Sequence, residues 1–275
     1  MTTPSVRDRF AAAAREERPD LAELCLLIGA EADPALDGPA CDLAQIELDR
    51  LAGLLPYGLS TPLDWANALH RVLGAGHGFR GVAADYQKLS SSLLQEVLRR
   101  RRGLPILLSV VWIEVARRAG APVYGVALPG HFVVGFGDPA GSYVLVDPFE
   151  GGQVLSEADT ELMVATVTGG PLEAAMLAPA DPLDIVQRIL NNIRAWAAPR
   201  PEHRPVQLWT FDLTLLLPRH PAKLRLQRAQ LLVKMGDFLG GAAEMEEYAD
   251  VIGAFDPESA AGIRAAARGA RAMLN

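Results

Sequence analysis

A helix-length apolar segment followed directly by strand-like segments is the feature that most constrains the fold of this chain. Residues 105–118, PILLSVVWIEVARR, are apolar on most sides of a helix, which predicts a helix buried in the core. After Gly120 the pattern changes: residues 122–128, 131–137 and 142–149 are short, rich in valine and aromatic residues, and separated by glycine and proline. The sequence therefore predicts a buried helix packed on a small antiparallel sheet.

The first hundred residues are predicted to form helices. Asp20 is the predicted N-cap of one helix, and Thr61 followed by Pro62 predicts the start of another. A helix between these two has an apolar stripe formed by Leu43, Ile46, Leu51 and Leu54. Four arginines, residues 99–102, end a further helix; we interpret them as cations at the negative end of a helix capped by Gly103, and not as an anion-binding patch.

A second helical region is predicted from residue 181 onwards, with a break where Pro199, Pro201 and Pro205 cluster. Within it, small residues and turn residues recur at positions typical of a helix–turn–helix repeat of about 34 residues of the tetratricopeptide kind: Ala229, Gly236, Phe238 and Ala243. The predicted fold class is α+β and mainly helical. The predicted domains are 1–180, which holds the N-terminal helices and the buried helix with its sheet, and 181–275, a repeat-like helical region.

Charge and composition exclude several classes of partner. The chain has 33 acidic and 26 basic side chains, a net charge of −7, so it has no general attraction to nucleic acid or anionic lipid. Its longest apolar run, residues 104–116, is interrupted by Glu114 and is too short to span a bilayer. The N-terminal segment lacks the apolar stretch of a signal peptide. We therefore expect a cytoplasmic protein without a membrane or nucleic-acid partner.

Neither a cofactor nor a metal is predicted. The glycine-rich stretch 74–78, GAGHG, does not follow a strand, so it is not a phosphate-binding loop. His70 and His77 are seven residues apart and have no carboxylate or cysteine at ligand spacing. The two cysteines, Cys25 and Cys41, are predicted to be buried thiols within helices, because two cysteines in a chain of this length do not suggest a disulfide framework.

His131 and Asp147 form the candidate site. If the turn between their strands is centred on Pro139 and Ala140, residues whose numbers sum to about 279 lie opposite each other, and these two sum to 278. A carboxylate beside an imidazole fixes the tautomer of the ring and stabilises its cationic form. The sequence predicts that the two side chains are in hydrogen-bond contact, or one water apart, facing the start of the buried helix.

A nucleophile is missing from this arrangement. Thiol-based acyl transfer needs a cysteine at a helix N-terminus, where the helix dipole lowers the thiol pKa and backbone N–H groups bind an oxyanion. The buried helix begins instead at Pro105, which supplies neither an N–H group nor a nucleophile. Ser109 lies one turn later on the same side, about 6 Å deeper, where a serine commonly bonds back to the i−4 carbonyl.

Three motifs, R-G-L-P-I-L-L-S, G-V-A-L-P-G-H-F and V-D-P-F-E-G-G, occur in this order, with QRILNNIRAW further downstream. The chain resembles the SirB-type transglutaminase-like family over most of its length. The resemblance implies a papain-like transglutaminase core joined to tetratricopeptide-like C-terminal helices. It also places Pro105 at the nucleophile position, where SirB-type members commonly carry proline, and His131 and Asp147 at the other two catalytic positions, as a relic dyad.

Two functions stay open at this point. The first is a non-catalytic scaffold that binds an unidentified protein or peptide partner. The second is a hydrolase or acyltransferase that uses Ser109 as nucleophile with His131 and Asp147, which requires the hydroxyl to lie within about 3 Å of its base. Because the nucleophilic cysteine is absent, we favour the first.

Overall fold

The computed structural model describes residues 4–274 and divides the chain into two compact units, Met1–Ile189 and Leu190–Asn275. Helix α8 (Pro182–Ala197) runs across the division. The structure is mostly helical with one small antiparallel sheet, which confirms the predicted α+β fold class. The domain boundary at 180/181 stays a prediction. No helix within residues 4–274 has both the length and the apolar character needed to cross a membrane.

The helices of the N-terminal unit begin at the residues that their caps specify. Asp20 accepts a hydrogen bond from the backbone N–H of Glu23, and Thr61 forms a reciprocal capping box with Asp64, as the sequence predicts. The helices are α1 (Val6–Ala13), α2 (Leu21–Ala32), α3 (Gly38–Ala52), α4 (Pro62–Leu69), α5 (Leu94–Arg100), α6 (Pro105–Arg118) and α7 (Glu157–Thr168). Between them lie the π-helix η1 (His70–Gly76) and the short 3-10 helices η2 (Ala83–Gln87), η3 (Leu89–Ser92), η4 (Pro148–Glu150) and η5 (Ala174–Leu177).

Helix α6 is the core of this unit, and its predicted bounds are confirmed. All residues from Ile106 to Ala116 are buried, including the charged Glu114. The carboxylate of Glu114 is only 1% exposed and accepts hydrogen bonds from Arg117 and Arg118, which supply the opposite charge that a buried carboxylate requires.

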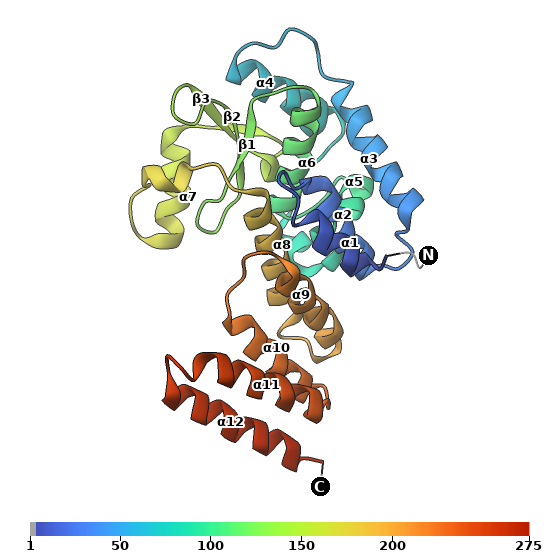
Figure 1. Cartoon of the computed structure of the whole chain (residues 1–275). Coiled ribbons are helices and arrows are strands. Elements are labelled where there is room, and N and C mark those ends of the chain that lie inside the picture. The colour runs from blue at the N-terminus through green and yellow to red at the C-terminus, as the bar shows by residue number, and fades with distance from the viewer. Residues whose placement is uncertain (1–3, 275) are drawn as a thin grey trace. The chain divides into compact units, whose positions relative to one another are not determined.

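Within residues 4–274, four strands form one antiparallel sheet in the order β1 (Val123–Val126), β2 (Val133–Gly137), β3 (Tyr143–Asp147) and β4 (Gln153–Leu155). Helix α6 packs against one face, where Gly125 lies close to Ile113. On the other face, Val133 and Leu145 pack against Val164 of α7. Figure 1 shows the sheet between these two helices.

The hairpin register differs from the predicted one by one residue. Val134 pairs with Val146 and Gly135 with Leu145, so paired residues sum to 280 and not 279. The backbone N–H of Gly141 donates to the carbonyl of Asp138, so Pro139 and Ala140 are the central residues of the turn, as predicted. The N–H of Asp138 donates to the carbonyl of Ser142, so the connection holds one extra residue, which shifts the register. Asp147 therefore lies opposite the position of Val133, two residues after His131.

The C-terminal unit consists of helices: α9 (Arg204–Leu216), α10 (Lys223–Lys234), α11 (Phe238–Ile252) and α12 (Pro257–Ala272), with the 3-10 helix η6 (Pro201–His203) before them. The prolines between 199 and 205 mark the break between α8 and α9, as predicted. Gly236, with a φ of 93°, forms the turn between α10 and α11. Small side chains allow α10, α11 and α12 to pack closely, with Ala229, Ala242 and Ala267 buried between them. The predicted packing position Ala243 is exposed; its neighbour Ala242 is the buried one.

Candidate functional site

Pro105 occupies the first turn of α6, at the end of a tightly packed connection. Leu104 is extended, and its backbone N–H donates to the carbonyl of Ser91 at 2.9 Å. A Cβ atom on Gly103 would lie 2.6 Å from the Cγ2 atom of Val97, so the connection has room only for glycine. The G-L-P sequence thus fixes where α6 begins, and the residue placed there carries no nucleophilic atom.

Ser109 does not provide a free hydroxyl. Its side chain is fully buried, and its Oγ donates a hydrogen bond to the carbonyl oxygen of Phe132 at 3.1 Å, not to the i−4 carbonyl that a serine in a helix commonly uses. The hydroxyl proton is held by a main-chain acceptor, and within the described residues no hydrogen bond joins Ser109 to His131. This geometry does not favour the serine-based alternative, because a nucleophilic hydroxyl must transfer its proton to a base.

His131 lies in the loop between β1 and β2, and an arginine that the sequence analysis missed fixes the loop. Arg188 of α8 donates to the carbonyls of Leu128 (3.1 Å) and His131 (2.7 Å), and its guanidinium lies 5.6 Å from the ring centroid of Phe132. Burial lowers the pKa of Arg188. The signal in the sequence is weak, because Arg188 lies at the edge of the apolar stripe of α8, next to polar residues such as Asp184 and Asn192.

Asp147 ends β3 and is 6% exposed. Its Oδ1 accepts a hydrogen bond from the backbone N–H of Phe149 at 2.8 Å, which forms the turn into η4. Burial raises the pKa of Asp147, and Glu150 raises it further, while the N–H of Phe149 and the nearby His131 oppose the rise. Within residues 4–274, no lysine or arginine forms an ion pair with this carboxylate.

The structure brings His131 and Asp147 near each other without a direct hydrogen bond. His131 lies two residues before the start of β2, and the hairpin brings it close enough to Asp147 for its charge to lower the pKa of that carboxyl. Among the described residues, the hydrogen-bond partner of the carboxylate is the main chain and not the imidazole. A water-mediated contact between the two side chains stays a prediction.

Replacing Asp147 by asparagine is expected to maintain or raise the free energy of unfolding at neutral pH. Asparagine keeps an acceptor for the N–H of Phe149 and removes a buried charge. Because the folded-state pKa of Asp147 lies above the unfolded value, the native state binds the proton more tightly, and stability falls as pH rises through this interval. The advantage of the variant should therefore shrink as pH falls through the folded-state pKa of Asp147, and it should be gone below about pH 4, the unfolded-state value. Urea unfolding of both proteins at several pH values measures this difference. A variant that is less stable than the wild-type protein, by an amount that grows as pH rises, would show that Asp147 is paired with a cation.

The turn that follows Asp147 is held by η1. The Nδ1 atom of His70 lies 2.9 Å from the carbonyl oxygen of Gly151, so this nitrogen carries the proton and donates it. A Cβ atom on Gly74 would lie 2.0 Å from the same oxygen. Gly151 and Gly152 both have positive φ, at 72° and 84°. The glycines of 74–78 and of the V-D-P-F-E-G-G motif therefore allow close contact between two main-chain segments.

Tyr86 is a further residue near Asp147 that the sequence analysis missed. Its ring is half exposed and lies 6.1 Å from that of Phe149. Burial raises the pKa of the Tyr86 hydroxyl, and the nearby carboxylate of Asp147 raises it further. The signal in the sequence is weak, because the aromatic residue precedes a run of serines without helical or strand periodicity.

The arginines at the end of α5 are used within the fold. Asp85, which is buried, forms ion pairs with Arg100 (3.4 Å) and Arg102 (3.5 Å). Arg99 pairs with Glu96, and Arg101 pairs with Glu47. These contacts agree with the interpretation that residues 99–102 are not an anion-binding patch. The predicted cap at Gly103 is wrong: Arg101 caps the helix in the left-handed conformation, with a φ of 57°.

Both cysteines are buried and lie in other helices, Cys25 in α2 and Cys41 in α3. Burial raises the pKa of both thiols. We expect iodoacetamide to alkylate them at least about tenfold more slowly in the native protein than in urea, since the thiolate is the reactive form. Mass spectrometry of timed samples measures the two rates; equal rates would show that a thiol is accessible and ionised in the fold.

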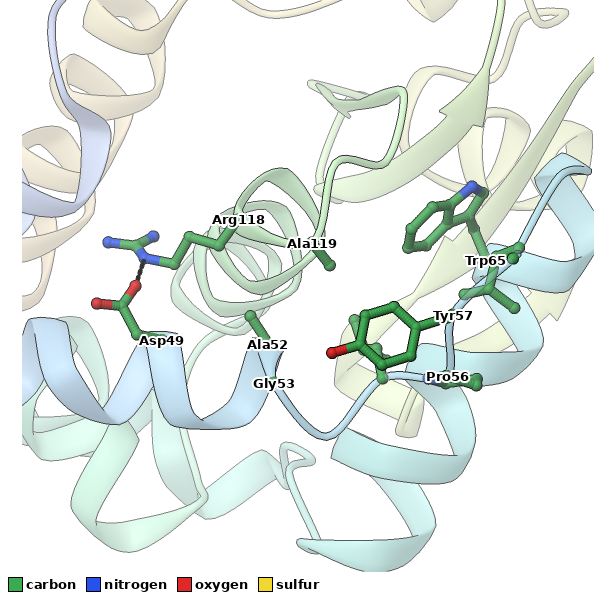
Figure 2. A pocket seen from close by; sticks show the side chains of 11 residues that line it. Asp49, Ala52, Gly53, Pro56, Tyr57, Trp65, Arg118 and Ala119 are labelled. Carbon is green, nitrogen blue, oxygen red and sulfur yellow. Dashed lines mark hydrogen bonds and ion pairs between the residues drawn. The ribbon is translucent and has the colours of Figure 1, made fainter.

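Two cavities are lined by residues other than His131 and Asp147. One of about 470 Å³ is bordered by Asp49, Tyr57, Trp65 and Arg118; Figure 2 shows the ion pair between Asp49 and Arg118 at one side and the two aromatic rings at the other. It lies at the C-terminal end of α6, about 20 Å from Pro105 along the helix axis. The other, of about 670 Å³, lies over α10, α11 and α12. Within residues 4–274, no group of three or more His, Cys, Asp or Glu side chains is arranged to hold a metal ion.

Comparison with known proteins matches residues 42–191 to the transglutaminase-like superfamily. A UPF0162 protein of Xylella fastidiosa is 32% identical over 240 residues, which cover 85% of this chain and 84% of that protein. A UPF0162 protein of Pseudomonas aeruginosa is 35% identical over 187 residues, 65% of each chain. F-box only protein 21 of Mus musculus is 27% identical over 179 residues, which cover 62% of this chain and 28% of that protein.

Proposed function

We propose that this chain, which belongs to the transglutaminase-like superfamily and to its UPF0162 family, is a non-catalytic, SirB-type member that binds a protein or peptide. In the enzymes, the helix that corresponds to α6 carries the nucleophile, and here that helix begins at Pro105. The observation that carries this proposal is the chemistry at the start of α6. Proline supplies no nucleophile there, and the hydroxyl of Ser109 is bonded to the carbonyl of Phe132.

The His131 and Asp147 pair then has a structural role. Without a nucleophile, an imidazole beside a carboxylate acts only as a weak general base towards water. The loop of His131 is fixed by Arg188, and the turn after Asp147 is fixed by His70. These contacts support a relic dyad that persists within a stable scaffold.

The C-terminal helices support the binding half of the proposal. The cavity of about 670 Å³ has a mainly apolar lining contributed by α10, α11, α12 and the turn between α11 and α12: Leu226, Met245, Tyr248, Ile252, Phe255 and Ile263. Phe255 is 89% exposed, and large exposed aromatic residues are typical of binding surfaces. We propose that 181–275 is a tetratricopeptide-like domain that receives an apolar peptide segment in this groove. We place the protein in the cytoplasm.

Activity-based labelling tests the catalytic half of the proposal. A fluorophosphonate probe should leave Ser109 unlabelled in the native protein, because the hydroxyl is buried and its proton is held by Phe132. A serine hydrolase labelled in parallel controls for probe reactivity. Labelling of Ser109 in the wild-type protein that disappears in His131→Ala would establish a serine enzyme and overturn the proposal.

A peptide library selected on the intact chain tests the binding half. Selected peptides should bind Phe255→Ser at least about tenfold more weakly than the wild-type protein, as expected when an exposed aromatic anchor is removed. Leu239→Ser is the matched control, because Leu239 is 60% exposed on α11 and does not line the groove. Peptides that bind both variants as tightly as the wild-type protein would place binding elsewhere.

A further inference from the structure

The cavity of about 470 Å³ in the N-terminal unit has the size of a small-molecule site, for which about 300–1,000 Å³ is typical. It is bordered by the end of α3, the segment 53–59 that follows it, Trp65 of α4 and the end of α6. Leu55 and Trp65, which are 7% and 9% exposed, form part of an apolar wall. A ligand in this cavity would therefore need an apolar part.

Two aromatic rings line the same side of the cavity. Figure 2 shows Tyr57 and Trp65 together, across the cavity from Asp49 and Arg118. Trp65 is mostly buried in the wall, whereas the side chain of Tyr57 is fully exposed, so its ring face is available to a ligand. The face of an aromatic ring carries partial negative charge and attracts cations, most strongly in tryptophan.

Two helices end at this cavity. Helix α3 ends at Ala52 with Gly53 as its C-cap, and α6 ends at Arg118 with Ala119 as its C-cap; all four residues line the cavity. The C-terminal end of a helix carries about half a negative charge, because its last carbonyl groups lack partners within the helix. Two such ends beside one cavity favour a positively charged ligand.

A chain of ion pairs at the edge of the cavity holds an excess of negative charge. It links Asp20, Arg117, Glu114, Arg118 and Asp49, in this order, so it begins and ends with a carboxylate. Arg118 already donates from all three of its guanidinium nitrogens, which leaves it poorly suited to bind an anion. Asp49 is 67% exposed and binds Arg118 through Oδ1; within residues 4–274, its Oδ2 accepts no hydrogen bond.

We propose that this cavity binds a small organic cation, an ammonium group that carries alkyl substituents. The two rings and the apolar wall would contact the alkyl groups, while the helix ends and the Oδ2 atom of Asp49 would stabilise the charge. A hard metal cation would need several oxygen ligands where the cavity offers rings. The site shares no lining residue with the groove of α10–α12, and it does not depend on the proposed function.

Choline and 3,3-dimethylbutan-1-ol, a neutral molecule of the same shape, test the proposal on the intact chain. Choline chloride should shift the indole N–H resonance of Trp65 along a saturable curve, relative to sodium chloride at equal concentration. The absence of this resonance in Trp65→Phe assigns it. The other three tryptophans do not line the cavity, so their indole resonances should stay in place. The alcohol should bind about threefold more weakly or less, because it lacks the charge.

Variants of Tyr57 show whether the exposed ring contributes. Tyr57→Ser should weaken choline binding about threefold or more, whereas Tyr57→Phe keeps a ring and should bind as the wild-type protein does. Because Tyr57 is fully exposed, circular dichroism should show both variants folded. Phe255→Ser is the matched control, because Phe255 is 89% exposed and does not line this cavity.

Four results would overturn the proposal. They are the absence of a saturable shift at Trp65, equal shifts of all the indole resonances, equal affinity for choline and the neutral alcohol, and a loss in Phe255→Ser as large as that in Tyr57→Ser. Equal affinity for the two molecules would show that the cavity recognises shape and apolar surface without selecting a charge.

Discussion

Replacing Gly74 by alanine is expected to lower the free energy of unfolding of the N-terminal unit by about 3 kcal/mol or more, one of the two largest effects of a single substitution expected here. The new Cβ atom would lie 2.0 Å from the carbonyl oxygen of Gly151 and 3.0 Å from its carbon. Both are main-chain atoms, so no side-chain rotation relieves the clash. The η1 helix and the turn after Asp147 must move apart, which breaks the hydrogen bond between His70 and Gly151.

Gly38→Ala is the matched control for this substitution. Gly38 begins α3, and an added Cβ atom has no neighbour within 4 Å. Alanine there should leave stability unchanged or raise it by up to about 0.5 kcal/mol, because it reduces the freedom of the unfolded chain. Chemical unfolding followed by circular dichroism compares the variants. A Gly74→Ala protein as stable as the wild-type would show that η1 and the turn are not in contact.

Trp112→Ala is expected to cost about 3–5 kcal/mol. Trp112 is fully buried in α6, its ring meets that of Phe79 edge-to-face at 6.0 Å, and its indole packs against Gly152. Its removal leaves a large cavity between α6 and the turn after Asp147. Thermal and urea unfolding of the purified variant measure the loss.

Trp112→Phe separates packing from hydrogen bonding at the same position. The buried Nε1 of Trp112 has no acceptor within residues 4–274, and an unpaired buried donor costs about 1–3 kcal/mol. Phenylalanine removes this donor and keeps most of the ring, so its cost should be clearly smaller than that of alanine. A phenylalanine variant as unstable as the alanine variant would indicate that the indole N–H is hydrogen-bonded.

Local patterns determine most of the fold that the sequence predicts. Caps such as Asp20 and Thr61 act within three residues, and α6 is long and apolar enough to be recognised from composition alone. In contrast, β4 is only three residues long, too short to show alternation. The π-helix η1 follows a regular helical pattern and has no signal of its own.

The candidate site was predicted only in part, because its geometry depends on contacts that are distant in sequence. The hairpin register depends on a single residue in the turn between β2 and β3. Gly137, the residue at which β2 ends, has a φ of 102°. The contact of Arg188 with the carbonyl of His131 spans 57 residues, and that of His70 with Gly151 spans 81. No periodicity in the sequence reports such pairs. The same limit applies to the apolar stripe predicted for α3, of which Leu51 is buried while Leu43 and Ile46 are exposed. Apolar residues on two sides of a helix do not show which side the fold buries.

Release of ammonia from a glutamine-containing peptide, with and without a primary amine, tests the central claim most directly. We expect the purified chain to release no more ammonia than buffer alone, because Pro105 cannot form an acyl intermediate and Ser109 is bonded to Phe132. His131→Ala and alkylation of Cys25 and Cys41 should change nothing. Turnover by the wild-type protein that His131→Ala abolishes would contradict the account and show that the His131–Asp147 pair serves a nucleophile in this fold.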